Sequence, residues 1–233
     1  AHTSGKPFFI APGFQKPHLP FVCPKKYYDL YTNEEVLRSP NPERGPGQPL
    51  FTIGKEINGI GIFGDFPKTG LSDKDIVHGL RSYYACVSFI DAQIGKILDE
   101  LEALDLMDST LLVVLSDHGW HLGDHGNWGK ATCFERATHA PLFVRAPGME
   151  TAGAQCDAFV EYVDLFPTIL DLCGFDIPDY MEGTSFSLLL ESPSAAWKSA
   201  VFSQFPRRAD FDGEMKNIEG YSIRTDRFRF TQW

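Results

Sequence analysis

Several features that define common protein classes are missing from this sequence. No apolar run approaches the roughly 20 residues of a membrane-spanning helix, and the N-terminus lacks the charged region and apolar core of a signal peptide. The sequence also has no Walker phosphate loop, no glycine-rich dinucleotide motif and no Gly-x-Ser-x-Gly elbow. We therefore expect no membrane partner and no nucleotide cofactor, and Ser-His-Asp catalysis is a poor fit.

Basic residues are in the minority. The 233 residues include 21 Lys and Arg against 31 Asp and Glu, which gives a formal net charge of −10. This balance argues against a broad basic face, so we predict no nucleic-acid partner. A local cationic pocket for a small anionic substrate remains possible.

Cysteines are few and scattered. The five cysteines form no C-x-x-C pair, and an odd number cannot be wholly paired within one chain. We expect most of them to be buried thiols.

Short apolar runs that end in turn residues alternate with helical spacing, which predicts an α/β fold. The sheet is expected to be mixed but largely parallel, because buried parallel strands read as continuous apolar runs. Helices are expected over 72–104, with Ser72 as N-cap, and over 163–174, with Pro167 in the first turn. Strands are expected over 8–12, 110–115, 140–148, 200–205, 221–224 and 228–231.

The most informative stretch follows the apolar run Leu112–Leu115. The run stops at Asp117 and His118, which offer a carboxylate and an imidazole at the end of a strand, where α/β folds place their chemistry. Both side chains could bind one cation. The alternative is a surface pair joined by a hydrogen bond.

The loop behind this pair carries further chemistry-bearing residues. Lys130 could neutralise a developing oxyanion or a transferred phosphoryl- or sulfuryl-type group, or it is an ordinary exposed lysine. We expect His121 to face solvent and His125 to shape the loop by hydrogen bonding.

Basic side chains are found at two other places. Lys16 and His18 lie on a proline-rich loop near the N-terminus. Arg207 and Arg208 follow an aromatic residue and a proline, and their planar guanidinium groups could grip a substrate carboxylate or simply be solvated.

Several motifs, taken together and in order, resemble the type I, formylglycine-dependent sulfatases of the alkaline phosphatase superfamily. The similar stretches are Lys6-Pro7-Phe8-Phe9, Lys16-Pro17-His18-Leu19-Pro20, Ser116-Asp117-His118-Gly119-Trp120, Leu122-Gly123-Asp124-His125-Gly126, Trp128-Gly129-Lys130, Ala137-Thr138-His139-Ala140-Pro141-Leu142, Val163-Asp164-Leu165-Phe166-Pro167-Thr168 and Glu182-Gly183-Thr184-Ser185. Ser203-Gln204-Phe205-Pro206-Arg207 and Gly220-Tyr221-Ser222-Ile223-Arg224-Thr225 are similar to the iduronate-2-sulfatase branch in particular.

The resemblance implies a mixed sheet between helices and a hydrolase of sulfate esters, such as a small-molecule or saccharide sulfate. It implies that Asp117 and His118 bind one divalent cation, expected to be Ca²⁺ rather than Zn²⁺ or Mg²⁺. It further implies that Lys130 and His18 are catalytic and bind the sulfate, and Arg207 is expected to bind substrate. Residues 1–190 would be part of the catalytic domain, and residues 191–233 would begin a smaller C-terminal sheet region.

The sequence departs from the family where the nucleophile should be. No cysteine or serine stands in a Cys-x-Pro-x-Arg or Ser-x-Pro-x-Arg motif, since Cys23 is followed by Pro24-Lys25-Lys26. The paired N-terminal aspartates of the family's metal site are also absent. We therefore expect this chain to be the C-terminal part of a longer sulfatase, to be inactive alone, and to depend on the missing N-terminal part for the formylglycine. From the family, a periplasmic, secreted or lysosomal protein is expected.

Two alternatives remain. The chain could belong to a phosphomonoesterase or phosphodiesterase of the same superfamily, because an Asp-His pair also suits zinc. It could instead be a non-catalytic module that retains a sulfatase-like fold.

Overall fold

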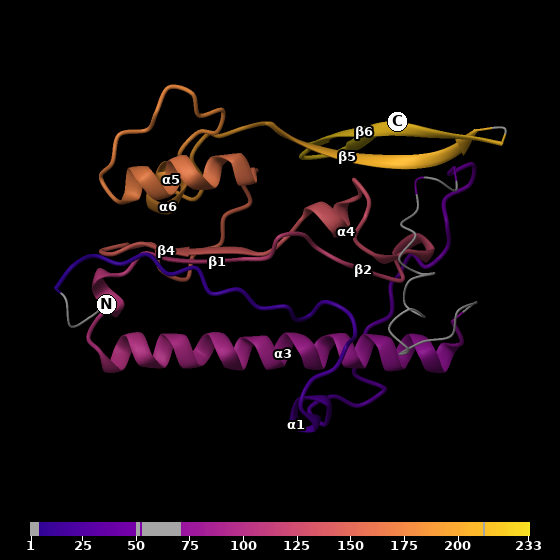
Figure 1. The fold of residues 1–233 in the computed structure, drawn as a ribbon, viewed down its shortest axis with the longest axis horizontal. Helices are drawn as coiled ribbons and strands as arrows, with labels where there is room; N and C mark the ends of the chain where they lie inside the picture. The colour runs from indigo at the N-terminus through magenta and orange to yellow at the C-terminus, as the bar shows by residue number, and fades with distance from the viewer. Residues whose placement is uncertain (1–4, 50–51, 53–70, 212) are drawn as a thin grey trace. The chain divides into compact units, whose positions relative to one another are not determined.

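The computed structural model describes residues 5–49, 52, 71–211 and 213–233. These residues fall into two compact units, of which one comprises Ala1–Arg38 and Asn58–Glu100 and the other Ser39–Ile57 and Leu101–Trp233. Figure 1 gives the course of the chain, and each unit is described by itself below. The expected division between residues 190 and 191 stays a prediction.

The first unit is built on a long helix, α3 (Asp73–Ala103), with a short helix, α1 (Lys25–Tyr28), before it. The predicted N-cap is confirmed: the Asp75 amide donates to Ser72 Oγ at 3.3 Å, and the Ser72 amide donates to Asp75 Oδ2 at 2.9 Å. This reciprocal pair satisfies two backbone donors that the first helical turn leaves unpaired.

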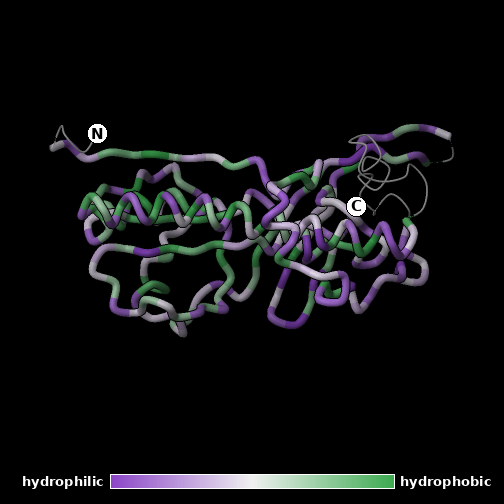
Figure 2. Tube along the Cα trace, turned by 90° about the horizontal axis from the view of Figure 1, so that it is seen from below, coloured by the Kyte–Doolittle hydropathy of each residue, from purple (hydrophilic) through white to green (hydrophobic). Residues whose placement is uncertain are grey.

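One face of α3 carries buried side chains. Leu80 and Cys86 on the helix are almost fully buried, as are Leu19 and Phe21 from the N-terminal segment. The rings of Phe21 and Tyr83 meet edge to face with centroids 5.5 Å apart. Figure 2 shows hydrophilic and hydrophobic residues interleaved along the chain, as an amphipathic helix requires. Among the described helices, none is both long and apolar enough to cross a membrane.

The strand expected over 8–12 is not found. Its residues have no strand assignment, and Phe9 and Ile10 are 82% and 67% exposed. A strand exists only through pairing, and no described strand pairs with this segment. The apolar run is real, but it lies at the surface of the described residues.

The second unit carries most of the elements. Its helical elements are η4 (Met107–Ser109), η5 (Asp124–Gly126), α4 (Glu135–Thr138), η6 (Tyr162–Asp164), α5 (Leu165–Leu172) and α6 (Ser187–Glu191). Its strands are β1 (Leu112–Leu115), β2 (His121–Leu122), β3 (Trp128–Gly129), β4 (Leu142–Arg145), β5 (Ala200–Phe211), β6 (Glu214–Thr225) and β7 (Arg229–Gln232). The α/β class expected from the sequence is confirmed.

Strand direction differs from the expectation. β1 pairs with β4 in antiparallel register, with Leu112 opposite Arg145, and every strand pair among the described residues is antiparallel. Parallel strands are usually joined by a crossover helix, whereas the longest helix between β1 and β4 is the single turn α4 (Glu135–Thr138). An apolar run predicts a strand but leaves its direction open.

The C-terminal region forms a three-stranded antiparallel sheet in the order β5-β6-β7. The three strands expected here are confirmed, and the first two extend into a hairpin of two 12-residue strands. Arg207, Gly220 and Arg229 lie at inward register positions, while their sequence neighbours are exposed. One face of this sheet is thus turned toward the rest of the unit.

An ion cluster around the buried Asp164 joins the start of α5 to the approach to β5. Lys198 Nζ donates to both carboxylate oxygens of Asp164, at 2.8 and 2.7 Å, and to Glu161 Oε2 at 2.8 Å. The Asp164 side chain is fully buried and also accepts the amides of Glu161 and Thr184. A buried carboxylate with these partners fixes the turn that precedes α5. Pro167 lies in the first turn of α5, as predicted.

This cluster yields the first prediction. Lys198→Ala leaves the buried Asp164 carboxylate without its ammonium partner, and we expect a loss of about 3 kcal/mol in the free energy of unfolding. Urea denaturation followed by circular dichroism measures it. Lys216→Ala is the matched control, because its partner Glu214 is exposed, and it should change stability by less than about 0.5 kcal/mol. Equal losses in both variants would show that the cluster contributes little.

Candidate metal and anion site

The site is built where β1 ends. The Ser116 amide donates to the Pro141 carbonyl at 3.2 Å, and Ser116 Oγ donates to the His118 carbonyl at 2.7 Å. The hydroxyl of Tyr162 donates to the Ser116 carbonyl. Burial, and secondarily the Asp117 carboxylate, raise the pKa of Tyr162, so the hydroxyl remains a donor. These bonds fix the backbone on which Asp117 and His118 stand.

Asp117 and His118 present two potential metal ligands to one another. His118 Nδ1 lies 2.7 Å from the Gly119 carbonyl, which can only accept a hydrogen bond, so this nitrogen carries the proton. His118 Nε2 lies 3.4 Å from Asp117 Oδ2. A nitrogen and a carboxylate oxygen at this separation suit a shared cation. The Gly119 carbonyl fixes the orientation of the imidazole, as hydrogen-bond partners of metal-bound histidines do. The pair therefore fits as two ligands of one ion.

Two ligands do not make a complete metal site. Within the part of the chain that the structure describes, no group of three or more His, Cys, Asp or Glu side chains could hold a metal ion. The Asp117 side chain is 83% exposed, which leaves it open to an ion and to further ligands. A carboxylate suits calcium and an imidazole suits zinc, so these two ligands alone leave the ion open.

Gly119 closes the functional loop by a very close backbone contact. Its amide donates to the Ala137 carbonyl at 2.8 Å. A Cβ atom at this position would lie 2.1 Å from the Arg136 carbonyl oxygen, so only glycine fits. The residue that follows the metal-ligand pair is thereby fixed against α4.

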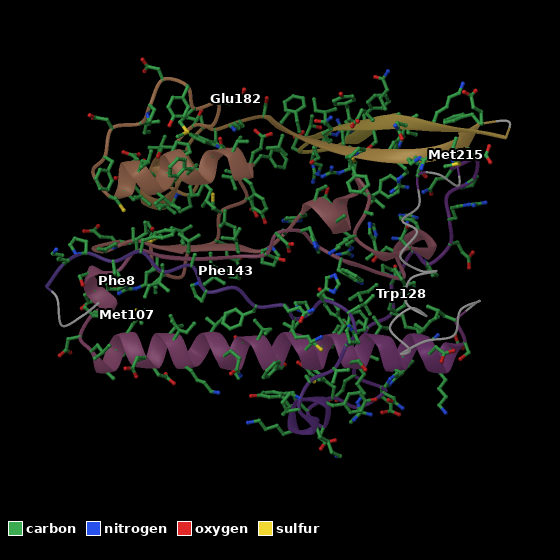
Figure 3. The ribbon with its side chains drawn as sticks, viewed as in Figure 1. Phe8, Met107, Trp128, Phe143, Glu182 and Met215 are labelled. Atoms are coloured by element: carbon green, nitrogen blue, oxygen red, sulfur yellow. The ribbon has the colours of Figure 1, made fainter. Side chains whose placement is uncertain are left out.

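Trp120 lies near both His118 and Lys130. The Lys130 ammonium lies 5.8 Å from the centroid of the Trp120 ring, and the His118 and Trp120 ring centroids are 6.4 Å apart. A cation within about 6 Å of an aromatic face is attracted to it. Asp117, His118 and Lys130 thus belong to one loop, with Trp120 beside both ends of the set. Trp128 on β3, two residues before Lys130, is labelled in Figure 3.

The expectation for His121 was wrong. The side chain is only 1% exposed, and Nε2 lies 2.9 Å from Thr132 Oγ1. The pairing of β2 with β3 folds His121 inward, where its ring meets Phe134 edge to face. Burial is the largest cause that lowers the pKa of His121, to about 4. This histidine is a neutral structural residue at neutral pH.

His125 shapes the loop, as expected. Its backbone amide donates to the Asn41 carbonyl at 2.7 Å, and its Nδ1 lies 3.2 Å from the Glu43 carbonyl. The neighbouring Asp124 accepts hydrogen bonds from Ser39 Oγ at 3.0 Å and from Arg136 Nε at 3.3 Å. Asp124 is therefore engaged in holding the loop.

His18 lies in the first unit. Its Nδ1 lies 2.7 Å from the Leu19 carbonyl, which can only accept a hydrogen bond, so this nitrogen carries the proton. Lys16 Nζ donates to the carbonyls of His18 and Pro20, at 3.1 and 2.5 Å, and so braces the turn that carries His18.

Arg207 lies on β5, next to the segment that contains Lys130. Its guanidinium donates to the Ala131 carbonyl and lies 5.5 Å from the ring centroid of Phe205 and 5.1 Å from that of Trp233. The predicted contact of Arg207 with substrate stays a prediction.

Sequence reasoning missed the groups that support the loop. Glu135, Arg224 and Arg229 form a cluster in which both arginines donate to Glu135 Oε2, at 3.0 Å from Arg224 Nε and 2.9 Å from Arg229 Nη2. The signal available in the sequence was the alternation of the strands, which puts both arginines at positions expected to face inward, where a charged residue needs a partner. For Tyr162 the sequence offers no comparable sign.

Comparison with known families covers the whole chain. A family model described as Sulfatase matches residues 1–175, and one described as N-sulphoglucosamine sulphohydrolase, C-terminal, matches residues 123–233. The first match takes in His18 and the loop with Asp117, His118 and Lys130. The second takes in Lys130, Arg207 and the C-terminal sheet.

Individual relatives agree with these families. The iduronate 2-sulfatase of Homo sapiens is 32% identical over 295 residues, which cover 99% of this chain and 52% of that protein. The phosphonate monoester hydrolase SpPMH from Silicibacter pomeroyi superposes with a TM-score of 0.73 at 28% identity, over 93% of this chain and 46% of that one. An enzyme solved in complex with its substrate D-glucosamine-2-N,6-O-disulfate gives a TM-score of 0.58 at 30% identity, over 73% and 35%. The chain spans about half the length of the curated relatives it matches.

The buried His121 predicts a specific response to acid. Its pKa falls from 6.5 in the unfolded chain to about 4 in the folded protein, so the unfolded state binds a proton first. Protonation of His121 should leave the free energy of unfolding unchanged above pH 6.5 and should lower it by about 3 kcal/mol as the pH drops from 6.5 to 4. Urea midpoints measured across this range test the effect.

The control is His121→Gln, which keeps a hydrogen-bonding side chain but cannot titrate. Between pH 6.5 and 4, the free energy of unfolding of this variant should fall by about 3 kcal/mol less than that of the wild type. Identical slopes in the two proteins would mean that His121 is accessible to protons in the folded state.

Proposed function

The chain belongs to the sulfatase family, and on this basis we propose that it forms part of a sulfuric ester hydrolase that cleaves organic sulfate esters. The observation that carries the proposal is the loop after β1, where His118 lies beside Asp117 and the Trp120 ring lies near both His118 and the Lys130 ammonium. A sulfate ester brings a negative charge and a leaving oxygen, and this loop offers a cation-binding pair and a fixed ammonium.

Lys130 and His18 would act directly on the substrate. The Lys130 ammonium would bind the sulfate oxygens and stabilise the charge that grows on them in the transition state. His18 would contact the same group through Nε2 and could protonate the departing oxygen, which is the usual task of a positioned imidazole near neutral pH. The Lys16 contacts keep the His18 turn in place for this role.

The proposal includes a metal ion and a nucleophile that other residues must complete. Asp117 Oδ2 and His118 Nε2 would hold one divalent cation, which we propose to be Ca²⁺ in line with the family, with Zn²⁺ and Mg²⁺ as alternatives. When bound, the ion would act as a Lewis acid toward the sulfate. The nucleophile would be a formylglycine in a further part of the same protein, because no cysteine or serine here has the required motif.

The exposed apolar surface of the second unit suits contact with such a further part. Leu115 at the end of β1 is 43% exposed, and Phe143 on β4, labelled in Figure 3, is 66% exposed. Side chains of this size in adjacent strands are usually covered by other protein. We propose that the remaining part of the protein covers them and completes the site.

We propose a sulfated saccharide as the substrate class. The support comes from relatives: one is named for iduronate 2-sulfate chemistry, and one was solved with a disulfated glucosamine.

A second candidate function has its own support. The phosphonate monoester hydrolase from Silicibacter pomeroyi shares the fold over nearly the whole chain, so hydrolysis of a phosphorus ester is the alternative. A non-catalytic module is the third possibility. These three outcomes differ in the product released.

The test is a pair of assays on the full-length protein that carries this sequence. We expect release of sulfate from aryl and sugar sulfates, with little phosphate from matched phosphate esters, and loss of turnover on chelation of divalent cations with recovery on addition of Ca²⁺. Lys130→Ala should lower turnover by about a hundredfold or more without unfolding the protein. Lys96→Ala, an exposed lysine on α3, is the matched control and should leave turnover unchanged.

Preferential phosphate release would favour the alternative function. Release of neither product by a correctly modified protein would favour the non-catalytic module.

A further inference from the structure

The segment that follows Lys130 is held on one side by the C-terminal sheet. Arg207 donates to the carbonyl of Ala131, and Arg229 Nη1 donates to the carbonyl of Cys133 at 3.0 Å. Arg229 also binds the Glu135 carboxylate through Nε at 3.1 Å and Nη2 at 2.9 Å. The sheet therefore holds residues 131, 133 and 135, which alternate along the segment.

The alternate residues Lys130, Thr132 and Phe134 lie against the loop that follows Asp117 and His118. Lys130 lies beside the Trp120 ring, and Thr132 Oγ1 lies 2.9 Å from His121 Nε2. The ring of Phe134 meets the His121 ring with centroids 6.3 Å apart. The segment thus separates two partners: the sheet on one side, and Trp120 and His121 on the other.

Arg207 and Arg229 come from one face of the sheet and from the strands at its two edges, while Arg224 on the middle strand also donates to Glu135 Oε2 at 3.0 Å. Arg207 is on β5 and Arg229 is on β7, with β6 between them. On β6, Gly220 leaves room for the Trp233 ring, because a Cβ there would lie 2.7 Å from a ring carbon. Trp233 in turn lies beside the Arg207 guanidinium. Figure 1 shows α4, which begins at Glu135, next to the ribbon of β5 and β6.

Arginine suits this task better than lysine. Its planar guanidinium donates in several fixed directions, so Arg229 can bind a carbonyl and a carboxylate at the same time. Side chains that bind backbone carbonyls and an internal carboxylate constrain the position of the chain they bind.

We propose that Arg207 and Arg229, here called the arginine clamp, are positioning residues that set the location of the Lys130 ammonium. The proposal rests on the proposed role of Lys130 in binding sulfate. The arginine clamp fixes the backbone from Ala131 to Glu135 against the sheet, and this presses Lys130 toward Trp120 and the Asp117-His118 pair. Arg207 then acts through Lys130, in place of the substrate contact that its sequence context suggests.

The test is a double-mutant cycle in the full-length protein with a sulfate ester as substrate. Arg207→Ala should lower kcat/KM by about tenfold to a hundredfold, because a small misplacement of a catalytic group costs that much. In a Lys130→Ala background the same change should lower kcat/KM by less than about twofold, since residues that act through one another give non-additive losses. Arg207→Lys should recover only part of the loss.

This coupling separates positioning from other roles. A direct substrate contact by Arg207 would give the full loss in both backgrounds, and so would a fall in the amount of folded protein; either result overturns the proposal. Arg227→Ala, an exposed arginine in the turn before β7, is the matched control and should have no effect in either background.

Hydrogen exchange of the chain itself provides a second, activity-independent measurement. In Arg229→Ala, the amides of residues 131–135 should exchange faster than in the wild type, while α5 should be unchanged. If residues 131–135 of Arg229→Ala exchange at the wild-type rate, the proposal is overturned even if activity falls. The proposed function fails if the wild type hydrolyses no sulfate ester or if Lys130→Ala is fully active. In that case the hydrogen exchange of residues 131–135 alone tests whether the arginine clamp fixes this segment.

Discussion

One backbone contact controls the geometry of the functional loop. The Gly119 amide donates to the Ala137 carbonyl, and the absence of a Cβ at Gly119 lets the two backbones approach that closely. This contact closes the chain between the end of β1 and α4, so Asp117, His118 and Lys130 all lie in or beside one closed loop. The Ser116 amide on the Pro141 carbonyl and the β1-β4 pairing continue the closure.

Around this closure, charged groups are divided between structural and chemical tasks. Asp124, Asp164 and Glu135 accept hydrogen bonds or ion pairs from within the second unit, and they hold turns in place. The Asp117 carboxylate, by contrast, is largely exposed and faces His118. An acidic chain can therefore maintain a local site for an anion, because its carboxylates near the loop are mostly engaged by arginine and lysine.

The sequence predicted what depends on local chemistry. The cap at Ser72, the position of Pro167 in α5, and the placement of Asp117 and His118 just after a strand follow from residue types and spacing. Strand direction could not be predicted, because a run such as Leu112–Leu115 is equally apolar in either direction. The burial of His121 and the arginine clamp depend on contacts between segments distant in the sequence, which spacing along the chain does not encode.

Asp117, His118 and Lys130 are proposed to bind a metal ion and sulfate from one loop. A crystal structure of the full-length protein with Ca²⁺ and a sulfate ester or sulfate ion tests this proposal most directly. We expect a metal ion in contact with Asp117 Oδ2 and His118 Nε2, and sulfate oxygens within hydrogen-bond distance of Lys130 Nζ. A metal ion bound without Asp117 and His118, or sulfate bound away from Lys130, would contradict the proposal.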